Sequence, residues 1–252
     1  MSEVSLPNDK FSIFLTIVSM MQQSCDNMLI KGGKICQSSS RKSSIFDIDL
    51  EPLVGDIDLI VSRLESKKDL LETFRKQEVD MTLEINENNY IFRDRFSRVT
   101  CHNIKPEIAY KMNVPVSDLD KTLKLDDVEI IFEYTMNRMM IDRISSFRKA
   151  LSARHLVIEG KGDKVNLKIN TSDKSLATFG TLATIDDLQQ EFSGILPYYL
   201  NVVMTNVESI VFTLYSRPKE KDYLLKMESS IGTSPEIPIT VWALSNQTDG
   251  ED

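Results

Sequence analysis

Five carboxylates lie close together in the segment DIDLEPLVGDID, residues 47–58. Carboxylates at this density could bind a divalent metal ion for phosphoryl chemistry, as in a metal-dependent nuclease. Acidic residues here alternate with apolar ones such as Ile48 and Ile57, which is typical of strands with one face in water. We favour two such strands and keep the nuclease as an alternative. The carboxylates are Asp47, Asp49, Glu51, Asp56 and Asp58.

Other residues that could support catalysis are sparse. His102 follows Cys101, so a Cys/His nucleophile would require the fold to bring further partners to this pair or to His155. GKGDK at 160–164 lacks the spacing and the following helix of a phosphate-binding loop, and we interpret it as a turn. The three cysteines have no CxxC spacing, so neither a disulfide framework nor a zinc site is indicated. We predict no enzyme activity, no metal and no cofactor.

A basic segment runs from Arg138 to Arg154, with five basic side chains and the single acid Asp142, in a chain of formal net charge -8. The acidic total argues against a protein that binds nucleic acid with its whole surface. It allows a basic lining on an acidic body. In a helix over this segment, Arg138 and Lys149 would lie opposite an apolar stripe. That stripe would consist of Met140, Ile144, Phe147 and Leu151.

The elements that would position these residues recur four times along the chain. Each unit has a helix pattern, then two strand-like runs joined by a polar or glycine turn. Helices are predicted over 10–23, from a capping box at Ser66, from 138 to 151, and over 197–206. The paired strands are 28–31 and 34–37, 79–85 and 90–96, 155–159 and 164–169, and 210–216 and 222–228. Further strands are predicted at 45–50, 58–61, 128–135, 176–184, 191–196 and 239–244.

The repeated unit is therefore a strand, a helix and three strands, which predicts an α+β fold with helices on one face of antiparallel sheets. The spacing indicates two domains of two units each. An extended crossover with two prolines joins them, and a polar tail ends the chain. The predicted boundaries are 1–104, 105–124 for the crossover, 125–246, and 247–252 for the tail.

The longest apolar runs fall far short of the ~20 residues that span a bilayer. We therefore expect a soluble protein with no membrane contact. Its expected location is the cytoplasm, or the host-cell interior for a viral protein.

Three segments resemble those of the DNA sliding clamps. They are the N-terminal helix running into MLIKGGKICQ, the strand and helix in DLIVSRLESKKDLLETF at 58–74, and the ending YLLKMESS followed by ITVWAL. The organisation is most similar to the trimeric processivity factors of tailed phages, and more distantly to eukaryotic proliferating cell nuclear antigen. The resemblance implies the two-domain sliding-clamp fold.

The resemblance further implies a homotrimeric ring, closed head to tail, whose helices line a hole for double-stranded DNA. Lys and Arg aimed at phosphates would hold DNA without reading its sequence. The span between Lys174 and Arg217 contains no Lys or Arg, so the fourth helix would contribute weakly. The expected DNA-binding residues are Lys10, Lys68, Arg75, Lys76, Arg138, Arg143, Arg148 and Lys149.

Clamp partners insert a short peptide into an apolar pocket beneath the crossover and beside the last strand. The resemblance therefore implies a surface for a DNA polymerase and other replication or transcription factors, with a separate clamp-loader ATPase to open the ring. The alternative is that the same apolar residues only anchor the crossover on the sheet. The expected partner-binding residues are Ile108, Val114, Val116, Leu119 and Trp242.

The function predicted from the sequence is thus that of a sliding clamp, a DNA polymerase processivity factor. Besides the nuclease, a viral structural or assembly protein of the same architecture is a second alternative.

Overall fold

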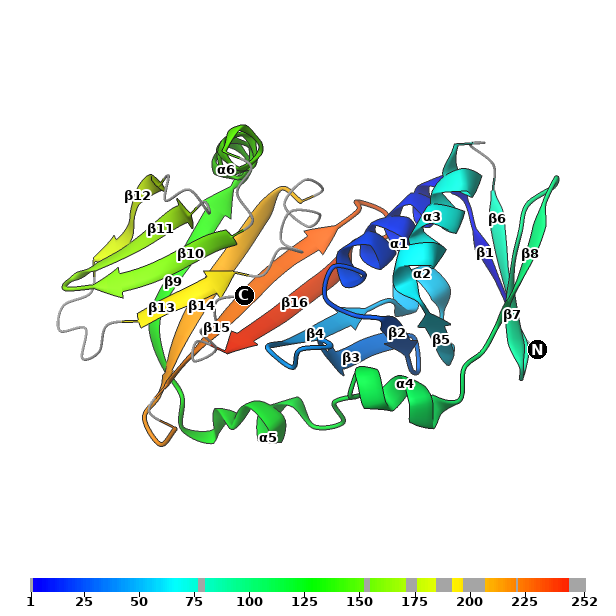
Figure 1. Cartoon of the computed structure of the whole chain (residues 1–252), viewed down its shortest axis with the longest axis horizontal. Helices are drawn as coiled ribbons and strands as arrows, with labels where there is room; N and C mark the ends of the chain where they lie inside the picture. The colour runs from blue at the N-terminus through cyan, green and yellow to red at the C-terminus, as the bar shows by residue number, and fades with distance from the viewer. Residues whose placement is uncertain are drawn as a thin grey trace. The chain divides into compact units, whose positions relative to one another are not determined.

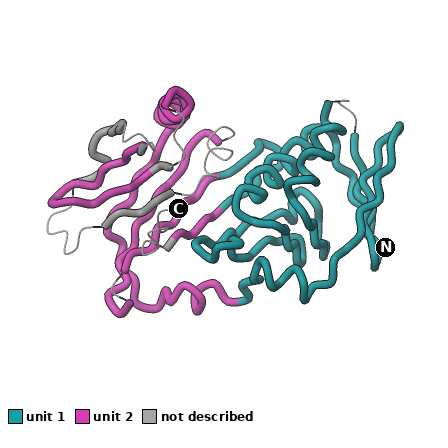
Figure 2. The backbone as a smooth tube through the Cα atoms, viewed as in Figure 1, with its two compact units in different colours: residues 1–117, 230–239 teal, residues 118–229, 240–252 magenta. Residues whose placement is uncertain are grey.

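A computed structural model describes residues 2–76, 80–151, 155–170, 176–184, 192–196, 207–220 and 222–244 (Figure 1). For residues 155, 156, 170, 176–184, 192–196 and 244 the description is of the backbone alone. The chain forms two compact units, residues 1–117 with 230–239 and residues 118–229 with 240–252 (Figure 2). Among the described helices, none is both long and apolar enough to cross a membrane.

The order of elements confirms the predicted repeat. The first repeat contains β1 (Ser2–Leu6), α1 (Asn8–Met21), β2 (Asn27–Ile30), β3 (Lys34–Ser38) and β4 (Ser44–Asp49). After the single-turn helix α2 (Glu51–Val54), the second contains β5 (Leu59–Ser62), α3 (Leu64–Arg75), β6 (Met81–Ile85), β7 (Asn89–Arg93) and β8 (Arg98–His102). The third contains β9 (Glu129–Asn137), α6 (Arg138–Ala150), β10 (His155–Lys161), β11 (Lys164–Asn170) and β12 (Leu176–Thr184). The fourth contains β13 (Phe192–Leu196), β14 (Ser209–Arg217), β15 (Asp222–Ile231) and β16 (Ile237–Leu244).

The helix predicted over 197–206 and the polar tail 247–252 lie outside the described residues. The three repeats with a described helix all follow the predicted order of one strand, one helix and three strands. The fold is therefore α+β with antiparallel sheets, as predicted.

Each repeat exchanges its leading strand with its neighbour. β1 pairs with β6 of the second repeat, and β5 pairs back with β2 of the first. In the other unit β9 pairs with β14, and β13 pairs with β10. All four pairs are antiparallel, and in three of them, β1–β6, β5–β2 and β13–β10, a leading strand joins the strand after the other repeat's described helix. The exchange therefore joins the repeats in two pairs.

The exchange leaves defined sheet edges. One sheet has the order β1-β6-β7-β8 and another the order β12-β11-β10-β13. β8 and β12 therefore end their sheets, and an edge strand carries backbone groups that can pair with another strand.

The core of the first unit forms around α1, which packs against α3 and β1. Apolar residues occupy most of α1, so eight of its side chains are buried, including the predicted Phe11, Phe14 and Val18. Phe14 contacts Phe92 of β7 at 6.4 Å between ring centroids, and Tyr90 meets Phe92 edge-on at 5.6 Å. Burial of these aromatic side chains is the main favourable term holding helix and sheet together.

The predicted glycine turn after β2 is confirmed, but the predicted pairing of the two strands that it joins was wrong, since β2 pairs with β5 and β3 with β4. Gly32 and Gly33 have φ values of 57° and 71°, and a Cβ on Gly33 would lie 2.5 Å from the Gly55 carbonyl oxygen. Only glycine fits there without a shift of the backbone. The turn joins β2 and β3 through the single bridge between Lys31 and Lys34, because β2 pairs mainly with β5.

Two predicted details of secondary structure were wrong. The second helix begins at Leu64 rather than Ser66, and the Ser66 hydroxyl donates to the Arg63 carbonyl instead of capping the helix. The crossover is not extended throughout, since it contains α4 (Pro106–Met112) and α5 (Leu119–Leu123), and the 3₁₀ turn η1 (Leu125–Asp127) follows it. Pro106 suits a first helical turn, and the Asp118 carboxylate caps α5 by accepting from the Lys121 amide.

Candidate functional site

Helix α6 positions the largest group of predicted DNA-binding residues. It follows β9 directly, and the Asn137 side chain caps it by accepting from the Met140 amide at 3.1 Å. Its buried side chains are Ile141, Ile144 and Arg148. The buried face is thus rotated from the predicted stripe, of which Ile144 is buried and Phe147 is 41% exposed.

The cations of α6 divide into two pairs. Arg143 and Lys149 are exposed. Arg138 pairs with Asp142 at 2.9 Å and donates to the Val207 carbonyl at 3.0 Å. Arg148 is only 5% exposed, so its guanidinium belongs to the interior of the unit. A positive charge in the sequence does not reveal which side of the helix faces inward, so the sequence did not separate these pairs.

The other predicted cations lie on α1 and α3. Arg75 and Lys76 are exposed at the end of α3, where cations are favoured by the helix dipole. Lys68 is half-buried and pairs with Glu72 at 3.4 Å. Lys10 is half-buried on α1. Within the first unit, the end of α3 therefore carries the most accessible of the predicted cations.

The predicted partner-binding residues are exposed to different degrees. Ile108 and Val114 are 52% and 40% exposed, whereas Val116 and Leu119 are half-buried. Tyr110 and Met112, at 42% and 43% exposed, were missed by the sequence reasoning. The alternating apolar positions 108, 110, 112 and 114 were the signal, but a short helix followed by an extended segment shows no single period. We call these four exposed side chains, Ile108, Tyr110, Met112 and Val114, the crossover patch; Ile108 and Met112 share one side of α4, and Tyr110 lies on another.

The crossover patch is held in place by buried amides. Asn113 is fully buried, accepts from the Asn27 amide at 3.1 Å, and donates to the Ser38 carbonyl at 3.1 Å. Gln37 is also fully buried and bonds the backbone of Leu29 and Asn27 at 2.7 and 2.9 Å. Satisfied buried amides fix a unique geometry, because any shift would leave polar groups unpaired.

The backbone after Asn113 extends the sheet beside β3. The Ser38 amide donates to the Val114 carbonyl at 2.9 Å, and the Val116 amide donates to the Cys36 carbonyl at 2.8 Å. The side chain of Val114 is exposed although its backbone is bonded to β3, so Val114 fits the partner-binding interpretation of the crossover. Half-buried Val116 fits the anchoring role.

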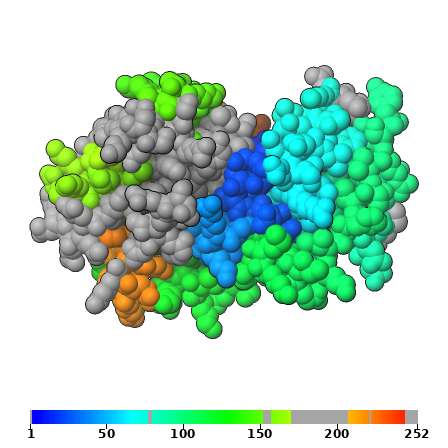
Figure 3. Space-filling view, in the orientation of Figure 1, coloured from blue at the N-terminus to red at the C-terminus, as the bar shows by residue number. Residues whose placement is uncertain are grey.

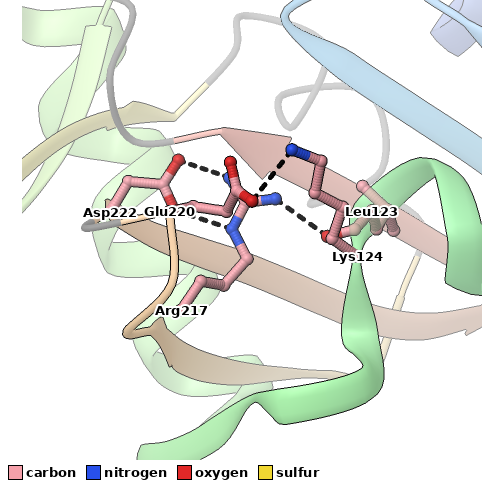
Figure 4. A network of polar contacts seen from close by, with 5 residues as sticks. All are labelled: Leu123, Lys124, Arg217, Glu220 and Asp222. Atoms are coloured by element: carbon pink, nitrogen blue, oxygen red, sulfur yellow. Dashed lines mark hydrogen bonds and ion pairs between the residues drawn. The ribbon is translucent and has the colours of Figure 1, made fainter.

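The far part of the crossover is anchored in the second unit by Arg217. This side chain is 7% exposed, pairs with Asp222 through two nitrogens, and donates to the Leu123 carbonyl at 2.8 Å (Figure 4). Beside it, Lys124 has a φ of 56° and pairs with Glu220 at 2.8 Å, which lowers the pKa of that carboxyl. The buried guanidinium therefore connects α5 to the β14–β15 hairpin.

Trp242, the fifth predicted partner residue, is 6% exposed within the second unit. Its ring lies 5.9 Å from that of Tyr215, and the Lys226 ammonium lies 5.4 Å above it. Trp242 is therefore buried in this cluster and offers little surface to a partner, contrary to the prediction.

The carboxylates of 47–58 make local contacts. Asp49 accepts from the Glu51 amide and pairs with Lys34 at 3.8 Å. Asp58 accepts from the Gly32 amide at 2.8 Å, which steadies the glycine turn. Asp47 and Asp49 lie on β4, as predicted. The prediction was wrong for the other three, because Glu51 begins α2 and both Asp56 and Asp58 precede β5. Across the described part of the chain, no three His, Cys, Asp or Glu side chains are placed to hold a metal ion.

The cysteines are poorly suited to nucleophilic chemistry. Burial raises the pKa of Cys25 to about 12, and burial together with Asp47 raises the pKa of Cys36 to about 11. Burial also raises the pKa of Cys101, next to exposed His102. Activated cysteines have lowered pKa values, so these thiols behave as structural groups. The side chain of His155 lies outside the described residues.

A search against protein-family models and a search of curated proteins each found no match. Solved structures do match along nearly the whole chain. A chain of the PCNA2–PCNA3 complex from Sulfolobus tokodaii is similar with a TM-score of 0.64 and 12% identity, over 97% of this chain and 99% of that one. PCNA from Thermococcus kodakaraensis gives 0.59 and 11%, over 96% and 98%. Proliferating Cellular Nuclear Antigen from Entamoeba histolytica gives 0.62 and 11%, over 97% and 98%. The chain therefore has the fold of the PCNA sliding clamps.

Proposed function

We propose that this chain is a DNA sliding clamp, a ring-forming processivity factor of the tailed-phage type that tethers a DNA polymerase to duplex DNA. The observation that carries the proposal is the repeat itself. Three described strand-helix-three-strand units and the strands of a fourth exchange leading strands in pairs, and the same fold covers 97% of the chain in a PCNA structure. The proposed role is one of binding, inside the cell, without catalysis.

In this proposal the cations of the helices hold DNA by its phosphates. Arg75 and Lys76 on α3, with Arg143 and Lys149 on α6, are exposed and can follow a phosphate backbone. Phosphate contacts are nearly equal at every register, so they attract DNA without trapping the protein at one sequence. Half-buried Lys68 and Lys10 would act at longer range. Arg138 and Arg148 would serve the protein's own packing.

Ring closure would use the sheet edges. In an antiparallel ladder, hydrogen-bonded and non-hydrogen-bonded residue pairs alternate. The Asp94 amide donates to the Ser97 carbonyl and the Asn103 amide to the Asn88 carbonyl, which shows which pairs of the β7–β8 ladder are hydrogen-bonded. With this alternation, Thr100 directs its N–H and C=O away from β7, toward the open edge. We propose that β8 of one chain pairs with β12 of the next. Two different edges joined in this way give a heterologous contact, and we propose that it closes into a ring of three chains.

The trimer is tested by the mass of the intact protein in sedimentation analysis. Thr100→Pro removes an outward N–H while keeping the β7–β8 bonds, so we expect it to weaken the trimer by at least roughly tenfold in dissociation constant. Thr100→Val is the matched control and should remain trimeric. A wild-type monomer at micromolar concentration would remove the ring, and with it the proposed function.

The crossover patch, together with half-buried Val116, would receive the polymerase and the clamp loader ATPase. An exposed apolar patch on an anchored backbone suits a peptide with apolar side chains. Ile108→Ser should abolish stimulation of primed circular DNA synthesis in the presence of a loader while leaving the trimer intact. Stimulation equal to wild type would show that the patch only anchors the crossover.

A further inference from the structure

We propose that α6 contacts the sugar–phosphate backbone of duplex DNA through a mixed apolar and cationic face rather than through a row of cations. This proposal rests on the proposed function. Met139 is 77% exposed, Arg143 is exposed, and Phe147 keeps 41% of its surface exposed. Residues four apart share one side of a helix, so these three form a continuous strip. The atoms of α6 lie open to solvent at the top of Figure 3.

The strip carries fewer charges than the sequence predicts. Arg138 is engaged by Asp142 and the Val207 carbonyl, and Arg148 is buried on the opposite side. For a ligand of α6 there remain Arg143 within the strip and Lys149, which is exposed on another side of the helix. The only acid of α6, Asp142, is paired with Arg138. The exposed face is therefore positive and apolar together, which calls for an anionic ligand with apolar surface between its charges.

Duplex DNA has this character along its backbone, where deoxyribose rings alternate with phosphates. The strip from Met139 to Phe147 is about 12 Å long at 1.5 Å per residue. Measured along the duplex axis, that length corresponds to roughly three nucleotide steps of one strand at 3.4 Å each. Arg143 would bond a phosphate while Met139 and the exposed edge of Phe147 cover neighbouring sugars.

Contacts to sugars are compatible with sliding. The sugar is the same at every nucleotide, so an apolar contact to it carries no sequence information, as with phosphate contacts. Such a contact releases no counterions, and its contribution does not weaken with salt. Part of the affinity of the clamp for DNA should therefore persist when the ionic contacts are screened.

The test measures binding of the full-length protein to a fluorescent duplex of about 30 base pairs by anisotropy, over about 25 to 200 mM NaCl. Met139→Ser should weaken binding by roughly threefold at every salt concentration, because it removes apolar contact only. Arg143→Gln should lower the salt slope by about 0.9 for each phosphate that the side chain no longer neutralises. Ile130→Ser is the matched control, since Ile130 is 63% exposed on β9 and should leave binding unchanged.

Each other outcome overturns the proposal. If Met139→Ser binds DNA as the Ile130→Ser control does, the strip makes no apolar contact with DNA. If Met139→Ser changes the sedimentation mass instead, the strip is a contact between copies of the chain. If the wild-type protein forms a trimer and binds DNA, and Met139→Ser binds DNA equally well, only this inference fails. A wild-type protein that forms no trimer and binds no duplex would defeat the proposed function as well.

Discussion

Asn113 shows how one side chain sets the position of a surface. It is fully buried, and its amide satisfies the Asn27 N–H and the Ser38 carbonyl. Asn113→Ala leaves the Asn27 N–H without this acceptor and the Ser38 carbonyl with only the weak Cys25 thiol donor at 4.0 Å, so we expect a loss of about 2 to 4 kcal/mol in the free energy of unfolding. Urea titration measures it. The crossover patch adjoins Asn113. Binding of a polymerase-derived peptide to Asn113→Ala should therefore also weaken at urea concentrations too low to unfold the protein.

Asn103→Ala is the matched control for Asn113→Ala. The Asn103 amide donates to two carbonyls at 3.4 and 3.3 Å, at the long end for hydrogen bonds. Its removal should cost less than about 1 kcal/mol. If both variants lose the same free energy of unfolding, Asn113 contributes no more than an ordinary polar residue.

At the scale of elements, the sequence predicts what periodicity encodes. α1 and the hairpins repeat every 3.6 or 2 residues, and they appear within a few positions of the prediction. Crossover helices α4 and α5 are too short to show a period, and their signals are single residues, Pro106 and Asp118. The inward turn of Arg148 has no sequence signal, because burial of a guanidinium depends on what surrounds it in three dimensions.

Arg217 anchors α5, and its loss should release that element. Arg217→Met leaves Asp222 unpaired and the Leu123 carbonyl without its donor, which should cost about 3 to 5 kcal/mol and speed amide exchange over residues 118–127. Adding Asp222→Leu should restore more than half of the loss, because no charge then remains buried. Lys219→Met is the control, since its pair with Asp127 is exposed on both sides and is expected to contribute below about 1 kcal/mol. Unchanged exchange in Arg217→Met would refute the anchoring role.

At the scale of the whole molecule, the net charge is negative although exposed cations lie on the helices. The chain carries 38 acidic against 30 basic residues, yet Arg75, Lys76, Arg143 and Lys149 are all exposed on the helices of the repeats. An acidic protein with cationic helices repels DNA from most of its surface and attracts it at selected places. In a proposed clamp, function should therefore depend on where a cation lies more than on the net charge.

Reversing four helix cations tests that dependence. The variant with Arg75, Lys76, Arg143 and Lys149 changed to Glu should keep the trimer mass but lose at least roughly tenfold in stimulation of synthesis on primed circular DNA, because phosphate attraction becomes repulsion. The control changes Lys31, Arg41, Lys161 and Lys164 to Glu, which alters the net charge equally at exposed sites off the helices. The control should stimulate synthesis almost as wild type does. If both variants lose stimulation alike, net charge rather than the placement of the helices governs DNA contact.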